Sequence, residues 1–172
     1  MPVRPFTPPP ESDRTLIFPK FKPLPTENVD LELGAGTGMF AINYAANNPG
    51  RNLIAIERTA SKYGKFRNQL QKTSLDNLWA VHGDATHWVP KCIKNGSVEK
   101  CFILYPNPYP KKKQANLRWQ NMPFLHVLKQ KMTPDGELTF ASNLEWLALE
   151  AKDMLTQFWG FSLIDEKKTV SR

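Results

Sequence analysis

Apolar runs alternate with amphipathic patterns of helical period along most of the chain, and this order constrains the fold more than any other feature. Strands and helices in strict succession are typical of a parallel sheet that carries helices on both faces. The sequence therefore predicts an α/β architecture: a Rossmann-like, doubly wound, mainly parallel sheet. The expected strands cover 29–33, 52–57, 78–82, 100–105, 137–142 and 161–169, and the expected helices cover 39–47, 60–73, 120–131 and 144–160.

The first 28 residues differ in composition from the rest of the chain. Eight of the 15 prolines fall within residues 1–25, which rules out a helix there. We expect a proline-rich N-terminal extension over 1–28 that runs extended over the surface or stays mobile, with Thr15–Phe18 docking locally. The remaining residues, 29–172, have the length of one domain with its own core. Within that domain, Thr133–Gly136 carries a strong turn signal.

Cysteine usage and hydropathy indicate the compartment. The two cysteines, Cys92 and Cys101, match no metal-site spacing, and two thiols in a chain of this size predict a reduced protein without a disulfide framework. No apolar run reaches the ~18 residues of a membrane span, and the N-terminus has no apolar signal-peptide core. We therefore expect a cytoplasmic protein without a membrane segment or a metal centre.

Positive charge is concentrated in one window of the sequence. Residues 100–134 contain seven lysines and arginines and no acidic residue, whereas the rest of the chain carries 16 basic and 16 acidic side chains. The formal net charge of +7 therefore comes from this window alone. Concentrated positive charge attracts polyanions, so we expect residues 100–134 to face phosphate groups.

A glycine-rich turn follows the first strand of the predicted sheet. The segment VDLELGAGTGMF places Gly34, Gly36 and Gly38 between a buried strand and a helix. Because glycine has no side chain, we expect backbone N–H groups of this turn to approach a ligand. Met39 stands where a dinucleotide fingerprint has its third glycine, so the pattern does not favour a pyrophosphate ligand.

Acidic side chains surround this turn. Glu57 ends the second strand, 19 residues after Gly38, where folds of this kind place an acid on ribose hydroxyls. Asp84 follows the third strand, and Glu32 precedes the glycines inside an apolar strand end. A buried carboxylate is costly without a partner, and a cationic ligand would supply one. These carboxylates favour S-adenosylmethionine as the cofactor, because it carries a sulfonium charge and no phosphate. The pattern resembles the class I S-adenosylmethionine-dependent methyltransferases and implies their fold.

A second motif is more distinctive. Residues 105–114 read YPNPYPKKKQ, a stiff extended loop at the carboxyl edge of the sheet that is followed at once by three lysines. It resembles the signature of the tRNA (guanine-N7)-methyltransferase family, in which a strand ends in Phe-Pro-Asp-Pro-Trp-Pro-Lys-Lys-Arg-His. The segments LELGAGTG, IAIE, GDA and DGELTFASN also match in order, so the resemblance covers about 29–155. It implies methyl transfer to N7 of a guanine in the tRNA variable loop.

The resemblance also implies residue roles. The cofactor acids of the family fall on Glu32, Glu57 and Asp84, its catalytic aspartate on Asn107, and its guanine-side aspartate on Asn143. The expected cofactor-binding residues are Glu32, Gly34, Gly36, Gly38, Glu57, Asp84, Ala85 and Asn107. The expected substrate-binding residues are Lys111, Lys112, Lys113, Arg118 and Asn143, with tRNA bound through the basic window 100–134.

Asn107 and Asn143 depart from the family pattern, which has aspartates there. Guanine N7 has no proton to lose, so its methylation needs alignment and electrostatics and no general base. An asparagine can orient the base by hydrogen bonding but cannot offset developing positive charge. We therefore expect a slower enzyme, or a binder that has lost activity. The family also carries a Thr-x-Phe-Glu motif that is not reached by Arg172, so either the chain lacks it or the sequence stops before the native terminus.

Two other interpretations stay open. Asn107-Pro108-Tyr109 lies where amino-group methyltransferases have Asn/Asp-Pro-Pro-Tyr/Phe, with one proline fewer, so transfer to an exocyclic amine of a nucleic acid or to a protein is one alternative. The two Asp-to-Asn departures also fit a non-catalytic RNA-binding paralogue that keeps the fold. The sequence does not decide between a monomer and a homodimer.

Overall fold

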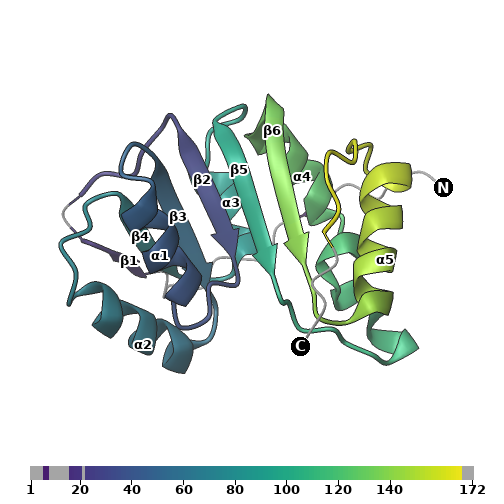
Figure 1. Ribbon diagram of the computed structural model, residues 1–172, viewed down its shortest axis with the longest axis horizontal. Coiled ribbons are helices and arrows are strands. Elements are labelled where there is room, and N and C mark those ends of the chain that lie inside the picture. The colour runs from purple at the N-terminus through teal and green to yellow at the C-terminus, as the bar shows by residue number, and fades with distance from the viewer. Residues whose placement is uncertain (1–5, 8–15, 21, 168–172) are drawn as a thin grey trace.

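The computed structural model describes residues 6–7, 16–20 and 22–167. Its strands are β1 (Leu16–Phe18), β2 (Val29–Leu33), β3 (Asn52–Glu57), β4 (Leu78–His82), β5 (Val98–Leu104) and β6 (Met132–Ala141). They form one sheet in the order β1-β4-β3-β2-β5-β6 (Figure 1). All neighbouring strands pair in parallel except β1, which is antiparallel to β4. The predicted α/β, mainly parallel sheet is confirmed.

Helices cover both faces of this sheet (Figure 1). The α-helices are α1 (Met39–Asn47), α2 (Ala60–Leu70), α3 (Ala85–Cys92), α4 (Phe124–Lys131) and α5 (Glu145–Asp153). Side chains alternate along β3: Leu53 and Ala55 join the core cluster of α1 and α2, whereas Ile54 and Ile56 join the cluster that contains α3 and α4. The sheet is therefore doubly wound, as predicted, with a separate apolar layer on each face.

The observed bounds agree with the sequence-based expectation at β2, β3, β4 and α1 and differ elsewhere. Helix α2 ends earlier, at Leu70, and α5 ends at Asp153 and continues as a π-helical turn over Met154–Phe158. The expected last strand is wrong for residues 161–167, which form no strand; residues 168–169 lie outside the described residues. The Phe161 N–H instead donates to the Leu155 carbonyl oxygen at 2.9 Å, and so closes the end of this turn.

Two further elements differ from the expectation. Helix α3 was not predicted, because Pro90 lies inside it and proline disfavours a helix interior; here it is the sixth of eight residues, near the helix end. The turn signal Thr133–Gly136 does not end β6 but forms an irregularity within it. In the pairing of β5 with β6, Val98 lies opposite Met132 and Lys100 lies opposite Glu137. The extra residues of β6 between these two pairs therefore bulge out of the ladder.

Part of the predicted N-terminal extension packs on the domain. The expected docking is found at β1, which adds an antiparallel strand to β4. Beyond β1, the indole Nε1 of Trp79 donates to the carbonyl oxygen of Pro23 at 3.1 Å, and Lys22 Nζ lies 4.7 Å from the centroid of the same ring. Residues 1–5 and 8–15 of the extension lie outside the described residues.

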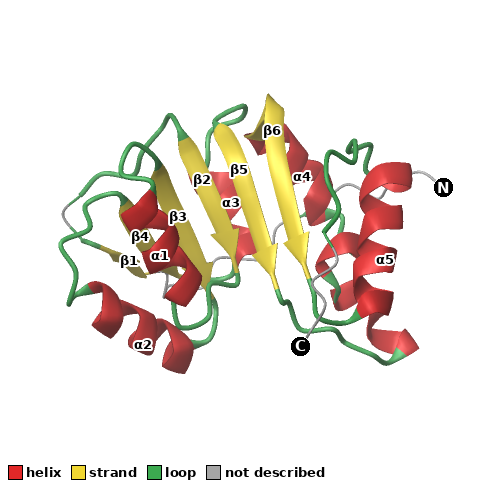
Figure 2. Ribbon diagram, in the orientation of Figure 1, coloured by secondary structure: helices red, strands yellow, loops and turns green. Residues whose placement is uncertain are grey.

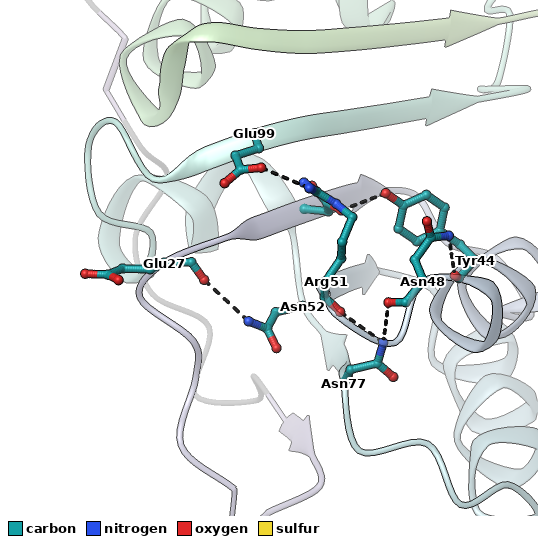
Figure 3. Close-up of polar contacts among 8 residues, drawn as sticks. Glu27, Tyr44, Asn48, Arg51, Asn52, Asn77 and Glu99 are labelled. Carbon is teal, nitrogen blue, oxygen red and sulfur yellow. Dashed lines mark hydrogen bonds and ion pairs between the residues drawn. The ribbon is translucent and has the colours of Figure 1, made fainter.

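The amino ends of the central strands are tied together by a polar network (Figure 3). Asp30 on β2 is fully buried, and both of its carboxylate oxygens accept hydrogen bonds from the Arg51 guanidinium. The hydroxyl of Tyr44 donates to the same carboxylate at 2.7 Å, and Arg51 also donates to Glu99 on β5 at 2.9 Å. This network joins β2, the α1–β3 turn and β5 at the edge opposite the strand carboxyl ends.

Candidate active site

The carboxyl ends of β2 to β6 meet at one edge of the sheet, and the connections that leave them gather there (Figure 2). Open α/β sheets bind ligands at this edge. Each predicted site residue lies at the end of one of these strands or in the connection that follows it. The topology therefore brings together residues that are up to 111 positions apart, from Glu32 to Asn143.

The glycine turn after β2 is closed by internal hydrogen bonds. The N–H groups of Gly34 and Ala35 donate to the Ile56 carbonyl oxygen at 2.8 and 2.9 Å, and the Gly36 N–H donates to Glu57 Oε2 at 2.8 Å. These three N–H groups are used within the protein, so they do not supply donors for phosphate oxygens.

The three glycines of this turn serve different purposes. All have positive φ, the left-handed region that favours glycine. A Cβ built on Gly34 or Gly36 would meet open space, whereas a Cβ on Gly38 would collide with the ring of Phe66, a fully buried residue of α2. Gly38 is therefore required for packing. Gly34 and Gly36 leave the space beside the turn free.

Glu32 is the unusual carboxylate of the site. Its side chain is buried, with 3% of the residue exposed, and its Oε2 has no hydrogen-bond partner within the described part of the chain. Burial, and then the charge of Glu57, raise the pKa of Glu32 to about 8. A buried carboxylate with an unpartnered oxygen is suited to a positively charged ligand.

Glu57 and Asp84 hold the neighbouring connections in place. Besides the Gly36 contact, Glu57 accepts a hydrogen bond from the Thr59 N–H at 2.6 Å, so its two oxygens link the glycine turn to the start of α2. Asp84 caps α3, accepting from the Thr86 N–H at 2.9 Å, and its other oxygen lies 3.6 Å from Arg58 Nη1. Ala85, the first residue of α3, is buried. These acids thus fix the shape of the edge around Glu32.

The loop 105–110 leaves the carboxyl end of β5. Asn107 lies exposed at its middle, and its Oδ1 accepts a hydrogen bond from the Tyr109 N–H at 3.3 Å. Tyr105 and Tyr109 both have positive φ, 49° and 43°, a conformation that costs a bulky residue on the order of 1 kcal/mol. Tyr105 is also 68% exposed. The loop therefore holds Asn107 between two strained aromatic residues.

Arg118 does not lie on the surface with the lysines. It is 9% exposed, and its guanidinium donates to the carbonyl oxygens of Pro108 and Tyr109 and to both oxygens of Glu150 on α5. The same guanidinium lies 4.9 Å from the ring centroid of Trp146. Arg118 therefore binds internal partners, and Glu150 is a participant that the sequence did not single out.

The basic window 100–134 does not form one surface. Lys111, Lys112 and Lys113 are exposed and follow loop 105–110 directly. Lys131, in contrast, is 8% exposed at the end of α4, where its carbonyl oxygen accepts from the Ser97 N–H before β5 begins, at the opposite edge. Lys129 donates to the carbonyl oxygens of Trp159 and Gly160. Positive charge at the candidate site therefore comes from the lysine triplet, and Asn143 lies exposed after β6 on the same edge.

Known proteins share sequence similarity with most of this chain. Residues 26–172 match a family model described as "Putative methyltransferase". The chain is also 30% identical to a tRNA (guanine-N(7)-)-methyltransferase from Rhizobium meliloti strain 1021, over 89% of this chain and 71% of that protein. The chain belongs to the tRNA (guanine-N7)-methyltransferase family. The resemblance based on the proline–lysine motif is thus confirmed.

The fold of this family member is that of the class I methyltransferases. A precorrin-6y C5,15-methyltransferase from Geobacter metallireducens superposes with a TM-score of 0.60 at 17% identity, over 78% of this chain and 64% of that one. A second relative, the tRNA (guanine-N(7)-)-methyltransferase of Thermotoga maritima, is 30% identical over 72% of this chain. The chain spans only 39% of the length of that relative.

No helix among the described residues is long and apolar enough to cross a membrane. No cluster of three or more His, Cys, Asp or Glu side chains that could hold a metal ion occurs among those residues.

Two features of the site were not singled out by sequence reasoning. The family resemblance covers the cofactor acids and Asn107, but it did not point to Glu150 or to the exposed ring of Tyr105. Glu150 belongs to no local pattern that sets it apart, and Tyr105 opens the motif of residues 105–114 but receives no role from the resemblance. Only the three-dimensional contacts reveal these two.

Proposed function

We propose that this protein transfers a methyl group from S-adenosylmethionine to N7 of a guanine in tRNA. The observation that carries the proposal is the meeting, at one edge of the sheet, of a buried and unpartnered carboxylate with the loop that presents Asn107. Neither the carboxylate nor the loop would suffice by itself. Together they supply a place for a cationic cofactor and a place for a base beside it.

The residues around Glu32 fit S-adenosylmethionine. Its Oε2 has no partner among the described residues, Gly34 and Gly36 leave free space, and the N–H groups of Gly34, Ala35 and Gly36 are already used within the protein. Glu32 would hold a positive group of the cofactor, and Glu57 and Asp84 would provide oxygens for its nucleoside part. When bound, S-adenosylmethionine supplies an electrophilic methyl group. The protein contributes position and negative charge.

Asn107 would orient the guanine. Its Oδ1 already accepts a hydrogen bond from Tyr109, and within the described part of the chain its Nδ2 donates to no other group. The free group is therefore a donor. The major-groove edge of guanine presents only acceptors, N7 and O6, whereas an exocyclic amine presents donors. A donor from Asn107 to O6 would leave the N7 lone pair free to attack, so this geometry favours N7 over an exocyclic nitrogen.

The lysine triplet Lys111–Lys113 would hold the RNA backbone. These side chains are exposed directly after loop 105–110, so phosphates bound there would lie next to Asn107. Lysine contacts with phosphates supply affinity without base specificity and weaken as salt rises. The affinity for RNA would therefore depend strongly on ionic strength.

Methyl transfer can be tested with labelled S-adenosylmethionine and unmodified tRNA, followed by nucleoside mass spectrometry. The expected product is 7-methylguanosine, with cofactor affinity reduced in Glu32→Gln. The matched control is Glu137→Gln, the same chemical change at an exposed position on β6. A methylated exocyclic amine would replace the N7 assignment. Cofactor binding without transfer to any tRNA would favour an RNA-binding paralogue that has lost activity.

A further inference from the structure

We propose that Arg118 and Glu150 are positioning residues that clamp loop 105–110 to helix α5 and so fix the place of Asn107. The inference rests on the proposed function for its kinetic consequence, but the clamp itself is a statement about the loop. It replaces the expectation that Arg118 binds RNA directly.

The loop has few means of holding itself. Three of its six residues are prolines, at 106, 108 and 110, and these have no N–H to donate. The Tyr105 N–H donates to the Ala141 carbonyl oxygen at 2.8 Å, which fixes the start of the loop to β6. The Tyr109 N–H is used on the side chain of Asn107. The second half of the loop therefore depends on donors from elsewhere.

Arg118 supplies those donors. Its Nε donates to the carbonyl oxygens of Pro108 at 3.2 Å and Tyr109 at 3.1 Å, and its Nη2 donates to Tyr109 at 2.9 Å. These are the two residues that follow Asn107. A planar guanidinium presents donors in a fixed fork, so it sets the direction as well as the distance of the carbonyl groups that it binds.

Glu150 anchors the other end of the guanidinium. Its two oxygens accept from Arg118 Nη1 at 2.9 and 2.7 Å, and it also accepts from Gln120 Nε2 at 3.2 Å and Asn121 Nδ2 at 2.9 Å. Donors from three residues before α4 thus converge on one side chain of α5. The ring of Trp146, one turn earlier on α5, packs against the guanidinium. The loop is tied to a helix and not merely to its own chain neighbours.

The charges in this cluster argue against a direct RNA contact. Residues 100–134 contain no acid, so the partner of Arg118 has to come from another element, and Glu150 provides it. The guanidinium is buried and paired with a carboxylate, whereas Lys111–Lys113 are exposed. An arginine in that state adds little to the field that attracts phosphate groups.

The clamp can be tested on Arg118→Lys and Glu150→Gln, with Arg67→Lys as the control. Lysine keeps the charge but loses the fork, and Arg67 is an exposed arginine on α2, away from the loop. The first readout is trypsin cleavage at Lys111–Lys113 in the full chain, which requires no methyl transfer. We expect cleavage to be about tenfold faster in both clamp variants. Loss of a hydrogen bond to a charged group should raise the population of molecules with the loop opened by about this factor. The control should match the unmodified protein.

The second readout is steady-state kinetics with tRNA. We expect kcat to fall by about 10- to 100-fold in Arg118→Lys, because small misplacements of a reacting group are costly, while the tRNA KM and the cofactor Kd change by less than about twofold. Glu150→Gln should also lower kcat. If Arg118 instead contacted RNA, Arg118→Lys would raise KM, and Glu150→Gln, by removing a negative charge, would improve RNA binding.

Each outcome decides the proposal. Unchanged cleavage in both variants overturns the clamp, even if they melt at lower temperature, because that pattern marks a purely stabilising ion pair. Faster cleavage with unchanged kcat overturns its role in positioning. If Arg118→Lys does not fold, Glu150→Gln, which keeps the shape of the side chain, gives both readouts. If the unmodified protein transfers no methyl group, the proposed function fails while the cleavage result still stands.

Discussion

Strand β2 carries two buried carboxylates, two residues apart, that differ in their partners. Asp30, at the amino end, accepts hydrogen bonds from Arg51 and Tyr44 and is fully satisfied. Glu32, at the carboxyl end, keeps an unpartnered oxygen within the described part of the chain and has a pKa raised to about 8. The same type of group on the same strand is thus a structural tie at one edge and an unpartnered group at the other. A missing partner, more than the acid itself, indicates where a ligand belongs.

The largest effect on stability is expected at Asp30, whose carboxylate has all its partners. Asp30→Ala leaves the Arg51 guanidinium without its buried partner, so the free energy of unfolding should fall by about 3–5 kcal/mol, measured by urea denaturation at pH 7. The control is Glu99→Ala, the half-exposed partner of the same arginine, which should cost no more than about 1 kcal/mol. Similar losses in the two variants would show that burial of Asp30 is not what ties this edge.

Two glycines of the turn after β2 should separate an effect on folding from an effect on cofactor binding. In Gly38→Ala the new methyl group collides with the buried Phe66 ring and the backbone has positive φ, so a loss of about 3 kcal/mol is expected. Gly36→Ala has the same backbone problem but open space, and should cost about 1 kcal/mol in denaturation experiments. Calorimetry should show weaker S-adenosylmethionine binding in Gly36→Ala. Unchanged binding there would place the cofactor elsewhere.

The unpartnered carboxylate of Glu32 predicts that the stability of the protein depends on pH. Because the folded pKa of Glu32, about 8, lies above its usual value of 4.5, the folded state retains a proton that the unfolded state loses. The contribution of Glu32 to the free energy of unfolding is therefore fully present below about pH 4.5, and it declines as the pH rises towards 8. Without cofactor, Glu32→Gln should be more stable than the unmodified protein by about 4 kcal/mol at pH 8 and equal to it at pH 4. Parallel stability curves for the two proteins would refute the assignment.

The smallest effect is expected at Asn107. A carboxylate at this position has no N–H group to donate to guanine O6, so Asn107→Asp should lower kcat about tenfold in the tRNA methylation assay. Stability should not change, because the side chain is exposed. The same substitution at the exposed Asn116 serves as the control. An equal or higher kcat in Asn107→Asp would show that Asn107 does not donate to the reacting base.

The sequence predicted the parallel sheet because its strands are buried on both faces and appear as continuous apolar runs, which fixed β2, β3 and β4 to the residue. It did not predict α3, because Pro90 conceals an otherwise helical pattern and its N-cap, Asp84, also fits a ligand-binding acid. The apolar residues Leu163 and Ile164 suggested a strand but are exposed and lie outside every strand. Periodicity indicates which residues are apolar, not which neighbour is available to pair with them.

The site was predictable as a set of residue types and not as a set of contacts. Glu32, Glu57 and Asp84 stand out because carboxylates at strand ends need partners. The partner of Arg118 is 32 residues away on another helix, and nothing local distinguishes an arginine that binds phosphate from one that binds Glu150. The basic window shows the same limit, since Lys131 is buried at the opposite edge while the triplet remains exposed.

The network around Asp30 also affects how this chain can evolve. It stabilises the sheet from the end opposite the candidate site, so exposed side chains at the carboxyl edge can change without loss of the native state. Asn107 and Asn143, where the family pattern has aspartates, are both exposed substitutions of this kind. Selection on turnover or on substrate preference can therefore act on that edge separately from selection on folding.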